Sequence, residues 1–388
     1  MKQLSSLVGV RLAVLAPISW PTPPPGYGPW EQIAANIADG MSARGLDVTL
    51  FATGNSKTRG RLASVVPVGL NEDPALNSDV HGALHIANLF RQAGEFDLIH
   101  NNLDWRPLTY AVATKGPPLV TTIHGFSSPQ ILAAYYACSS RSFYCSISDA
   151  DRDPGLDYVA TTYNGIDPSE FTFRERPGDY LVFLGRFHPE KGTHLAIEIA
   201  KRAGVRLKIA AIHQDMDYFT SEVAPHIDGD WVQFIGAVER EARDELLGNA
   251  LGLVHMTTRP ERFGLTLIEA MACGTPVLGA RLGSLPEIVV DGETGFLCDS
   301  VEDAVAHVPS LAQIDRRKCR ERVEKVFSLD KMIDRYLEVY RVALETKTPQ
   351  PPSPEKLAWR EHDYWDRPMA FTDHPPRPEH EPAPLVWR

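Results

Sequence analysis

The segment Tyr180–Ile212, YLVFLGRFHPEKGTHLAIEIAKRAGVRLKIAAI, shows the order of elements that recurs along the chain. Tyr180–Leu184 and Leu207–Ile212 are short apolar runs typical of buried strands. Thr193–Ala203 between them has the apolar spacing of a helix. Continuous apolar strands on either side of a helix predict a parallel sheet that is covered on both faces. The segment therefore predicts an α/β fold.

The same alternation continues on both sides of this segment. In the second half of the chain we expect helices at Glu239–Asn249 and Thr266–Cys273 and strands at Val232–Ile235, Gly252–His255 and Pro276–Gly279. In the first half we expect a helix at Glu31–Arg44 and strands at Arg11–Pro17, Leu46–Ala52, Asp97–His100, Pro118–Thr122 and Ser142–Ile147. The simplest interpretation is two successive doubly wound, Rossmann-like units. If the two units face each other, a cleft for a small molecule lies between them.

The length of 388 residues also suits two domains. We predict domains at residues 1–168 and 169–327, then a helix over 328–345 that crosses back to the first domain. Residues 346–388 form a Pro-rich tail, because residues 349–388 hold 10 of the 31 prolines. The tail also contains Trp359, Trp365 and Trp387, so we expect it to be extended and to contact the body through aromatic side chains.

For most of the chain, composition excludes disordered, collagen-like and disulfide-scaffold proteins. Apolar residues make up 43% and charged residues 23%, which is typical of globular domains. The 39 basic and 50 acidic side chains give a net charge of −11, which disfavours nucleic acid as a partner. No apolar run is long enough for a stable membrane span.

The cysteines and the N-terminus favour the cytoplasm. Five scattered cysteines without metal-type pairing fit a reducing compartment. Arg11 interrupts the apolar run near the N-terminus, so we interpret that run as a strand and not as a signal peptide. Peripheral attachment to a membrane is left open.

A glycine-rich turn, Pro25–Glu31, follows the first strand. It begins like G-x-G-x-x-G, but the sixth position is Glu31 and no acidic residue closes the second strand. Both features argue against a dinucleotide fingerprint. Backbone N–H groups at the start of a helix still favour phosphate, and a plain strand-to-helix turn is the alternative.

A pair of glutamates lies in Arg259–Pro276, RPERFGLTLIEAMACGTP. Glu261 lies before a predicted helix and Glu269 about one turn inside it, so both carboxylates can face one cleft. The N–H groups of Leu265 and Thr266 would be unpaired at the positive end of the helix dipole, where phosphate fits. A carboxylate can accept both hydrogen bonds of a ribose diol. Two solvated glutamates beside an ordinary helix are the alternative.

Two cations follow the first strand of the second unit, in LGRFHPEKG. Arg186 and Lys191 lie at the carboxyl end of a strand and before a helix, where an anion binds in open α/β sheets. Facing a diphosphate, they would stabilise the charge that develops as it leaves. The alternative interpretation is that both are ordinary surface cations. The presence of the glutamate pair in the same unit makes this interpretation less favoured.

Together these motifs resemble the retaining glycosyltransferases of family 4, which have the GT-B fold. GRFHPEKG resembles the family's G-R-x-x-x-x-K-G, and ERFGLTLIE resembles its E-x7-E motif, followed by EAMACGTPVLG. The resemblance also includes Gly283–Leu297, GSLPEIVVDGETGFL, the hinge-proximal Tyr163–Asp167, YNGID, and Thr122–Gly125, TIHG. It runs from about Arg11 to Leu344 and excludes the tail.

The resemblance implies roles for particular residues. Four residues would be catalytic: Glu261, His124, Arg186 and Lys191. Of these, Glu261 would contact the transferred sugar. Glu269 would hold the ribose hydroxyls. Donor binding as a whole would use Gly26, Gly28, Arg186, Lys191, Gly236, Val238, Phe263, Gly264, Leu265, Thr266 and Glu269. The family often has two adjacent glycines where this chain has Gly26-Tyr27-Gly28. This difference changes the geometry expected on the acceptor side of the site.

The implied activity is transfer of a hexosyl group from a nucleoside diphosphate sugar to an acceptor hydroxyl, with retention of anomeric configuration. UDP-hexose is the first choice of donor and GDP-mannose the second. Family members typically need neither metal nor another cofactor, and we interpret Asp215-Met216-Asp217 as a chance D-x-D.

Other functions and partners stay open. A non-catalytic sugar-nucleotide binder and a GT-B epimerase are the alternative functions. The acceptor can be a small molecule, a saccharide or a lipid-linked sugar, with a soluble acceptor preferred because Lys57, Arg59 and Arg61 form only a short basic cluster. A second copy of the chain, forming a homodimer, is a further partner.

Overall fold

In a computed structural model of the protein, the structure describes residues 7–126, 128–350, 352–353 and 356. The chain divides into two compact units. Unit 1 contains residues up to 147, 152–162 and those from 333 on, and unit 2 contains residues 148–151 and 163–332. The contacts expected of Trp359, Trp365 and Trp387 lie outside the described residues.

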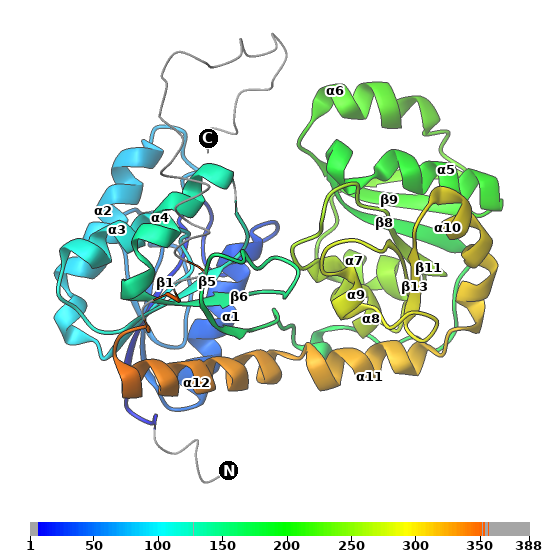
Figure 1. Ribbon diagram of the computed structural model, residues 1–388. Helices are drawn as coiled ribbons and strands as arrows, with labels where there is room; N and C mark the ends of the chain where they lie inside the picture. Colours follow the sequence, from blue (N-terminus) through cyan, green and yellow to red (C-terminus); the bar gives the residue numbers. More distant parts are fainter. Residues whose placement is uncertain (1–6, 127, 351, 354–355, 357–388) are drawn as a thin grey trace. The chain divides into compact units, whose positions relative to one another are not determined.

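Unit 1 is built on a seven-stranded sheet in the order β3-β2-β1-β4-β5-β6-β7. All the strand pairs are parallel. The strands are β1 (Arg11–Leu15), β2 (Asp47–Phe51), β3 (Arg61–Ala63), β4 (Leu98–Asn101), β5 (Leu119–Ile123), β6 (Ser142–Ser146) and β7 (Tyr158–Thr161). The central strands are buried on both faces because helices cover the sheet on either side (Figure 1).

The helices of unit 1 are α1 (Pro29–Ala43), α2 (Ser78–Arg91), α3 (Arg106–Ala113) and α4 (Leu132–Ala137). The last helix, α12 (Leu329–Thr346), begins in unit 2 and belongs to unit 1 from Ile333 on. Met332, Ile333, Tyr336, Leu337 and Tyr340 are buried and recur at helical spacing, so they form the buried face of the helix that was expected over 328–345.

A buried polar network joins α12 to the sheet of unit 1. His100 on β4 shares a hydrogen bond with the Tyr340 hydroxyl through Nδ1 at 2.6 Å, and another with the Thr122 hydroxyl through Nε2 at 2.8 Å. The Tyr336 hydroxyl lies 2.7 Å from the same Thr122 oxygen. Because each buried polar group has a partner, the network fixes the position of the helix on the sheet at little cost.

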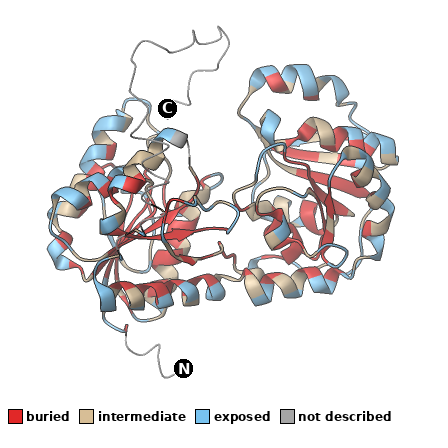
Figure 2. Cartoon of the chain, in the orientation of Figure 1, coloured by how far each residue is buried: buried red, intermediate tan, exposed pale blue. Residues whose placement is uncertain are grey.

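Unit 2 has a six-stranded parallel sheet in the order β10-β9-β8-β11-β12-β13. The strands are β8 (Tyr180–Phe187), β9 (Arg206–His213), β10 (Val232–Gly236), β11 (Gly252–His255), β12 (Val277–Ala280) and β13 (Gly295–Cys298). Its helices are α5 (Thr193–Ala203), α6 (Met216–Tyr218), α7 (Arg240–Gly248), α8 (Leu265–Ala272), α9 (Leu285–Ile288), α10 (Val301–His307) and α11 (Arg316–Val326). The strands and inner helix faces form the core, and outer helix faces are exposed (Figure 2).

These two sheets confirm the expected doubly wound architecture, and two of the local differences from the prediction concern residues that the sequence analysis named. Strand β8 runs three residues beyond Leu184, because β9 is also longer than predicted and pairs with it as far as Phe187. Arg186 therefore lies inside the strand and not in the following loop. In unit 1, Arg61 of the short basic cluster lies in strand β3, which the sequence analysis did not expect and which forms by pairing with the edge of β2.

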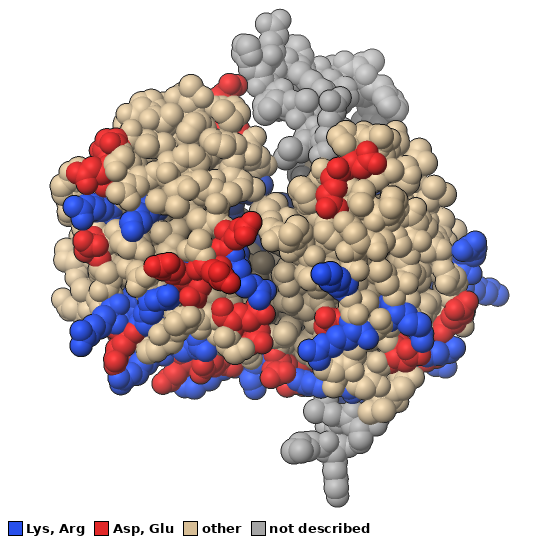
Figure 3. All heavy atoms as spheres, turned by 180° about the vertical axis from the view of Figure 1, so that it is seen from behind, with Lys and Arg blue, Asp and Glu red and all other residues tan. Residues whose placement is uncertain are grey.

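The surface carries charges of both signs. On the face shown in Figure 3, acidic and basic side chains are interspersed, with no extended area of Lys and Arg alone. No helix among the described residues is both long and apolar enough to cross a membrane. All five cysteines are buried and unbridged.

Candidate active site

The strand order of unit 2 points to one edge of its sheet. The order reverses between β8 and β11, which lie side by side although three helices and two strands separate them in the sequence. In open parallel sheets a ligand binds outside the carboxyl ends of the two strands at such a reversal. The segments that follow β8 and β11 contain Lys191 and Glu261, which the sequence already singled out.

Three charged or polar side chains meet at this point. Lys191 Nζ lies 2.6 Å and His255 Nε2 lies 2.8 Å from the same atom, Oε2 of Glu261. The side chains of His255 and Glu261 are only 4% and 10% exposed, and that of Lys191 is 21% exposed. Among the described residues, the other carboxylate oxygen, Oε1, has only the backbone N–H of Arg262, at 3.3 Å. The arrangement leaves one oxygen of Glu261 available to a ligand.

Two glycines allow these segments to approach one another. Gly192 has φ +67°, and a Cβ there would lie 2.0 Å from the carbonyl oxygen of Met256, just after β11. Gly283 has φ +61°, and a Cβ there would lie 2.4 Å from backbone atoms of Glu261. Both are conformations and spacings that only glycine accommodates. The two glycines thus place Lys191 and Glu261 against the end of β11.

The surroundings keep Glu261 ionised. Burial by itself raises the pKa of Glu261, but the hydrogen bond and charge of His255, together with Lys191, outweigh burial and hold that pKa well below its usual range. Glu261 is therefore a carboxylate, and an acceptor only, at neutral pH.

The start of helix α8 lies immediately after Glu261. Gly264 is the N-cap and contributes no side-chain cap, and Leu267 donates its N–H to the Gly264 carbonyl. In the described part of the chain the N–H groups of Leu265 and Thr266 have no hydrogen-bond acceptor. Phe263 is buried beneath this turn. Two free amides at the positive end of a helix suit an anion.

Glu269 lies on the first turns of α8 and is buried. Its Oε1 is 3.3 Å from Nη1 of Arg243 on α7. Burial raises the pKa of Glu269, and the positive charges of Arg243 and Arg240 offset only part of that effect. A buried carboxylate with one cationic partner retains further lone pairs for donors such as hydroxyl groups.

The remaining predicted donor residues of unit 2 lie around the neighbouring strands. Nη1 of Arg186, on β8, donates a hydrogen bond to the side-chain oxygen of Gln214, which follows β9. Gly236 ends β10, and Val238 is half-buried in the segment that leads to α7. Gly236 and Val238 therefore lie at and just beyond the carboxyl end of β10.

The D-x-D sequence has a structural use. The carboxylate of Asp215 accepts the backbone N–H of Tyr218 and caps the short helix α6. Among the described residues, no group of three or more His, Cys, Asp or Glu side chains is placed to hold a metal ion.

In unit 1 the strand order reverses between β1 and β4; Gly26 and Gly28 follow β1, and His124 follows β5, the neighbour of β4. Gly26 is exposed, and Gly28 is the N-cap of α1, where a Cβ would lie 2.9 Å from the Pro24 side chain. His124 follows β5, stacks on Trp30 with ring centroids 5.2 Å apart, and lies with Nε2 3.1 Å from Oδ1 of Asn102. Burial lowers the pKa of His124 to about 3, so its imidazole is neutral.

Acid is expected to destabilise unit 1. Burial lowers the pKa of His85 to about 4 and that of His100 and His124 to about 3. Between about pH 4 and 6.5 these three side chains therefore bind up to three more protons in the unfolded chain than in the folded chain. Burial of Glu31 works in the opposite direction, raising its pKa to about 7 and favouring the folded state below that pH. The net effect is a loss of roughly 2–3 kcal/mol per pH unit as the pH falls from 6.5 to 4.5.

Thermal unfolding followed by circular dichroism at constant ionic strength, between pH 7.5 and 4.5, measures this dependence. H85L should make it shallower, since leucine cannot bind a proton. An unchanged slope in that variant would contradict the assignment of His85 as a buried neutral imidazole.

Within unit 2 the structure brings Lys191, Glu261 and the start of α8 together, and within unit 1 it places Gly28 and His124 at one edge of the sheet. Sequence reasoning missed His255, Arg243 and Gln214, which contact Glu261, Glu269 and Arg186. A polar residue ending an apolar strand, such as His255 in GLVH, is the signal that could have revealed one of them.

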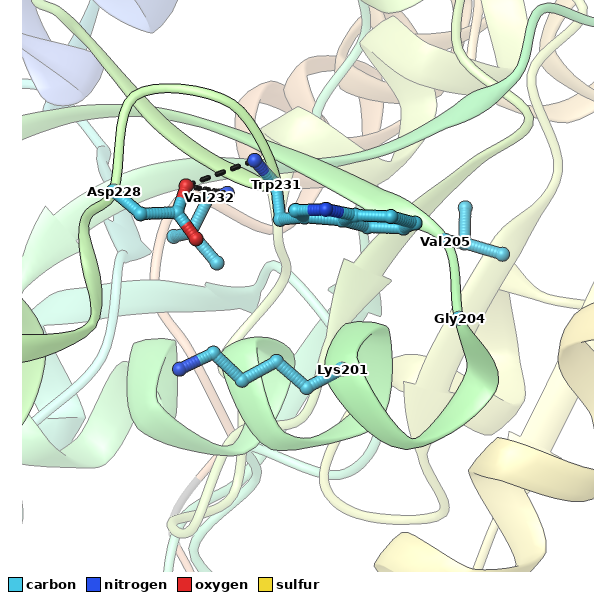
Figure 4. Close-up of a pocket in the computed structure, with 6 residues that line it drawn as sticks. All are labelled: Lys201, Gly204, Val205, Asp228, Trp231 and Val232. Atoms are coloured by element: carbon cyan, nitrogen blue, oxygen red, sulfur yellow. Dashed lines mark hydrogen bonds between the residues drawn. The ribbon is translucent and has the colours of Figure 1, made fainter.

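A separate hollow of about 250 Å³ lies at the opposite edge of the sheet of unit 2, where β9 and β10 begin. Figure 4 shows the ring of Trp231 above Lys201 of α5, with Asp228 beside them. Asp228 already accepts the backbone N–H groups of Asp230, Trp231 and Val232. Because it lies away from the carboxyl ends of the strands, this hollow is distinct from the candidate site.

Comparison with known proteins assigns both units to one family. Residues 170–326 match the family model described as Glycosyl transferases group 1, and residues 31–152 match that described as Glycosyltransferase Family 4. The chain is 29% identical to a glycogen synthase of Mycobacterium tuberculosis over 66% of this chain and 72% of that protein. It is 26% identical to a D-inositol 3-phosphate glycosyltransferase of Saccharomonospora viridis, over 86% of this chain and 94% of that protein.

Solved structures show the same fold. HepE of Anabaena, in complex with UDP and glucose, superposes with a TM-score of 0.67 at 20% identity and covers 86% of this chain and 100% of its own. Sucrose-phosphate synthase of Thermosynechococcus elongatus gives a TM-score of 0.70 at 18% identity, covering 87% of this chain and 100% of its own. The chain belongs to glycosyltransferase family 4, has the GT-B fold and is a glycosyltransferase.

Proposed function

We propose that the protein transfers a hexosyl group from a nucleoside diphosphate sugar to an acceptor hydroxyl, with retention of anomeric configuration and without a metal ion. The observation that supports this most is the meeting of Lys191, Glu261 and the open start of α8 at the strand reversal of unit 2. Positive groups, free amides and a carboxylate in one place match the three parts of such a donor.

Each part of the donor has a partner in this proposal. The diphosphate binds Lys191 and Arg186 and the amides of Leu265 and Thr266, and the ribose hydroxyls bind Glu269. The sugar hydroxyls bind the available oxygen of Glu261. The segment with Gly236 and Val238 approaches the base, and Gly26, Gly28 and His124 serve the side of unit 1.

The chemistry follows from charge. As the bond between the sugar and the phosphate oxygen breaks, negative charge accumulates on the departing diphosphate. Cations and helix amides that are already oriented stabilise this charge at little reorganisation cost, as a divalent ion does in metal-dependent transferases. To form this contact, Lys191 has to share its ammonium group between Glu261 and the phosphates or turn from one to the other.

UDP-hexose is the donor of first choice, and UDP-glucose its simplest test. The solved structure of HepE, which has the same fold, contains UDP and glucose. GDP-mannose is the second choice. The acceptor is a small molecule, a saccharide or a lipid-linked sugar.

The variant E269Q tests the nucleotide end of the site. If Glu269 accepts both ribose hydroxyls, wild type should bind UDP more tightly than 2′-deoxy-UDP by about tenfold or more, and E269Q should lose most of that preference. Isothermal titration with UDP and with 2′-deoxy-UDP gives the ratio of the two affinities. A parallel titration with GDP compares the two candidate nucleotides.

The matched control is E245Q, which changes an exposed carboxylate on the neighbouring helix α7. It should retain the wild-type preference. A preference for UDP that persists in E269Q would place the ribose elsewhere and remove the nucleotide site proposed here.

A further inference from the structure

The carboxylate of Glu261 is held asymmetrically. Two donors, Lys191 Nζ and His255 Nε2, converge on Oε2, while within the described ranges Oε1 has only a long contact with the backbone N–H of Arg262. Donors on a single oxygen fix both the position and the rotation of a carboxylate. They also decide which oxygen is left to accept a hydrogen bond from a ligand.

The two donors are not equivalent. Lys191 ends a short 3-10 turn, Pro189–Lys191, and has a flexible stem and a partly exposed ammonium group. His255 is the last residue of β11, whose backbone pairs with Gly279 of β12, and its ring is almost fully buried. The lysine can therefore move toward a bound anion, whereas the buried imidazole has little room to turn away from Glu261.

The proton between His255 and Glu261 belongs to the imidazole. Glu261 is ionised and can only accept, so Nε2 carries the hydrogen. The other ring nitrogen, Nδ1, is buried and has no partner among the described residues. In the described part of the chain, the single polar contact of this buried ring is therefore the one to Glu261, so the imidazole is anchored to that carboxylate.

We propose that His255 is a positioning residue that holds Oε2 of Glu261 when Lys191 turns to the diphosphate, so that Oε1 stays directed to the hydroxyls of the transferred sugar. This inference rests on the proposed function. His255 should therefore affect the affinity that the sugar adds to the donor, and the turnover. It should not affect the affinity for the nucleotide itself.

The test compares H255L, which removes the N–H donor, with H255Q, whose amide nitrogen can reach the position of Nε2. Titration with UDP and with UDP-glucose, and UDP release from UDP-glucose, are measured for each. In H255L we expect UDP affinity to change less than threefold, while the gain in affinity from the glucose and the value of kcat/KM fall by about 10- to 100-fold. H255Q should recover most of the loss.

Two controls separate positioning from folding. V254A truncates the adjacent buried residue of β11 and should lower stability without changing the ratio of the UDP-glucose and UDP affinities. In the background of E261Q, H255L should have little further effect, because the group that it positions is already altered. Should H255L not fold, H255N takes its place, since its shorter amide cannot reach Glu261, and it should behave unlike H255Q.

The outcomes are distinguishable. If wild type binds UDP-glucose and GDP-mannose no better than UDP and GDP and releases neither diphosphate, the proposed function fails. If wild type is active and H255L keeps the wild-type contribution of the sugar, or loses the same factor with and without E261Q, the positioning role of His255 is overturned. Equal losses in H255Q and H255N would overturn it too.

Discussion

K191M is expected to lower the turnover of a nucleotide sugar by about 10²-fold or more. Methionine fills a similar volume but removes the positive charge that lies 2.6 Å from Glu261 and follows strand β8. A charge that acts on the departing diphosphate contributes mainly to the transition state, so kcat should fall more than the affinity for donor. Initial rates of UDP release from UDP-glucose, and of GDP release from GDP-mannose, measure the effect.

K201M is the matched control for this variant. Lys201 also belongs to unit 2, but it lies on α5 beside the hollow at the opposite edge of the sheet, with Nζ 3.2 Å from His226 Nδ1. Its turnover should equal that of wild type. If K191M kept more than half of the wild-type kcat, Lys191 would have no part in leaving-group stabilisation.

R316M is expected to reduce the free energy of unfolding of unit 2 by roughly 3–5 kcal/mol. Arg316 is 4% exposed, and its guanidinium donates to the carbonyl oxygens of Arg174, Gly248 and Ala250 and to the Thr275 hydroxyl, at 2.6–2.9 Å. Methionine cannot donate, so three buried acceptors and the partly buried carbonyl of Arg174 would lose a partner. Urea denaturation followed by circular dichroism should show the midpoint falling by about 1 M or more.

The neighbouring residue supplies a control. Arg317 pairs with Glu175, and both side chains are more than 60% exposed. An exposed ion pair contributes about 0–1 kcal/mol, so R317M should unfold close to wild type. Equal midpoints for R316M and wild type would show that the four acceptors find water, and that the guanidinium does not stabilise this corner of unit 2.

Much of the fold could be read from apolar patterning. The strand Gly252–His255 and the helix Thr193–Ala203 have the predicted ends, and other elements shift by a few residues. Strand β3 could not be predicted, because Arg61–Ala63 has no apolar pattern and is a strand only through its pairing with β2. Likewise, the extension of β8 to Phe187 depends on the length of its neighbour β9. The residues that pair with the end of β8 are not close to it in the sequence.

The candidate site divides in the same way. The charged residues Lys191, Glu261 and Glu269 were visible as motifs beside predicted strand and helix ends. Their partners were not, because His255 and Arg243 reach the two glutamates across turns whose geometry the sequence does not specify. Arg316 carries no motif either, since its four acceptors come from segments up to 142 residues away.

The order and type of the residues alone determined the alternation of strands and helices, the family and the chemical groups available to bind a sugar nucleotide. Only the tertiary structure decided which oxygen of Glu261 is held by two donors, which cation can move and which buried histidine contacts Glu261. The physical reason is one of range. Apolar periodicity acts between neighbours along the chain, whereas the meeting of β8 and β11 depends on a strand order that arises only when the whole sheet is assembled.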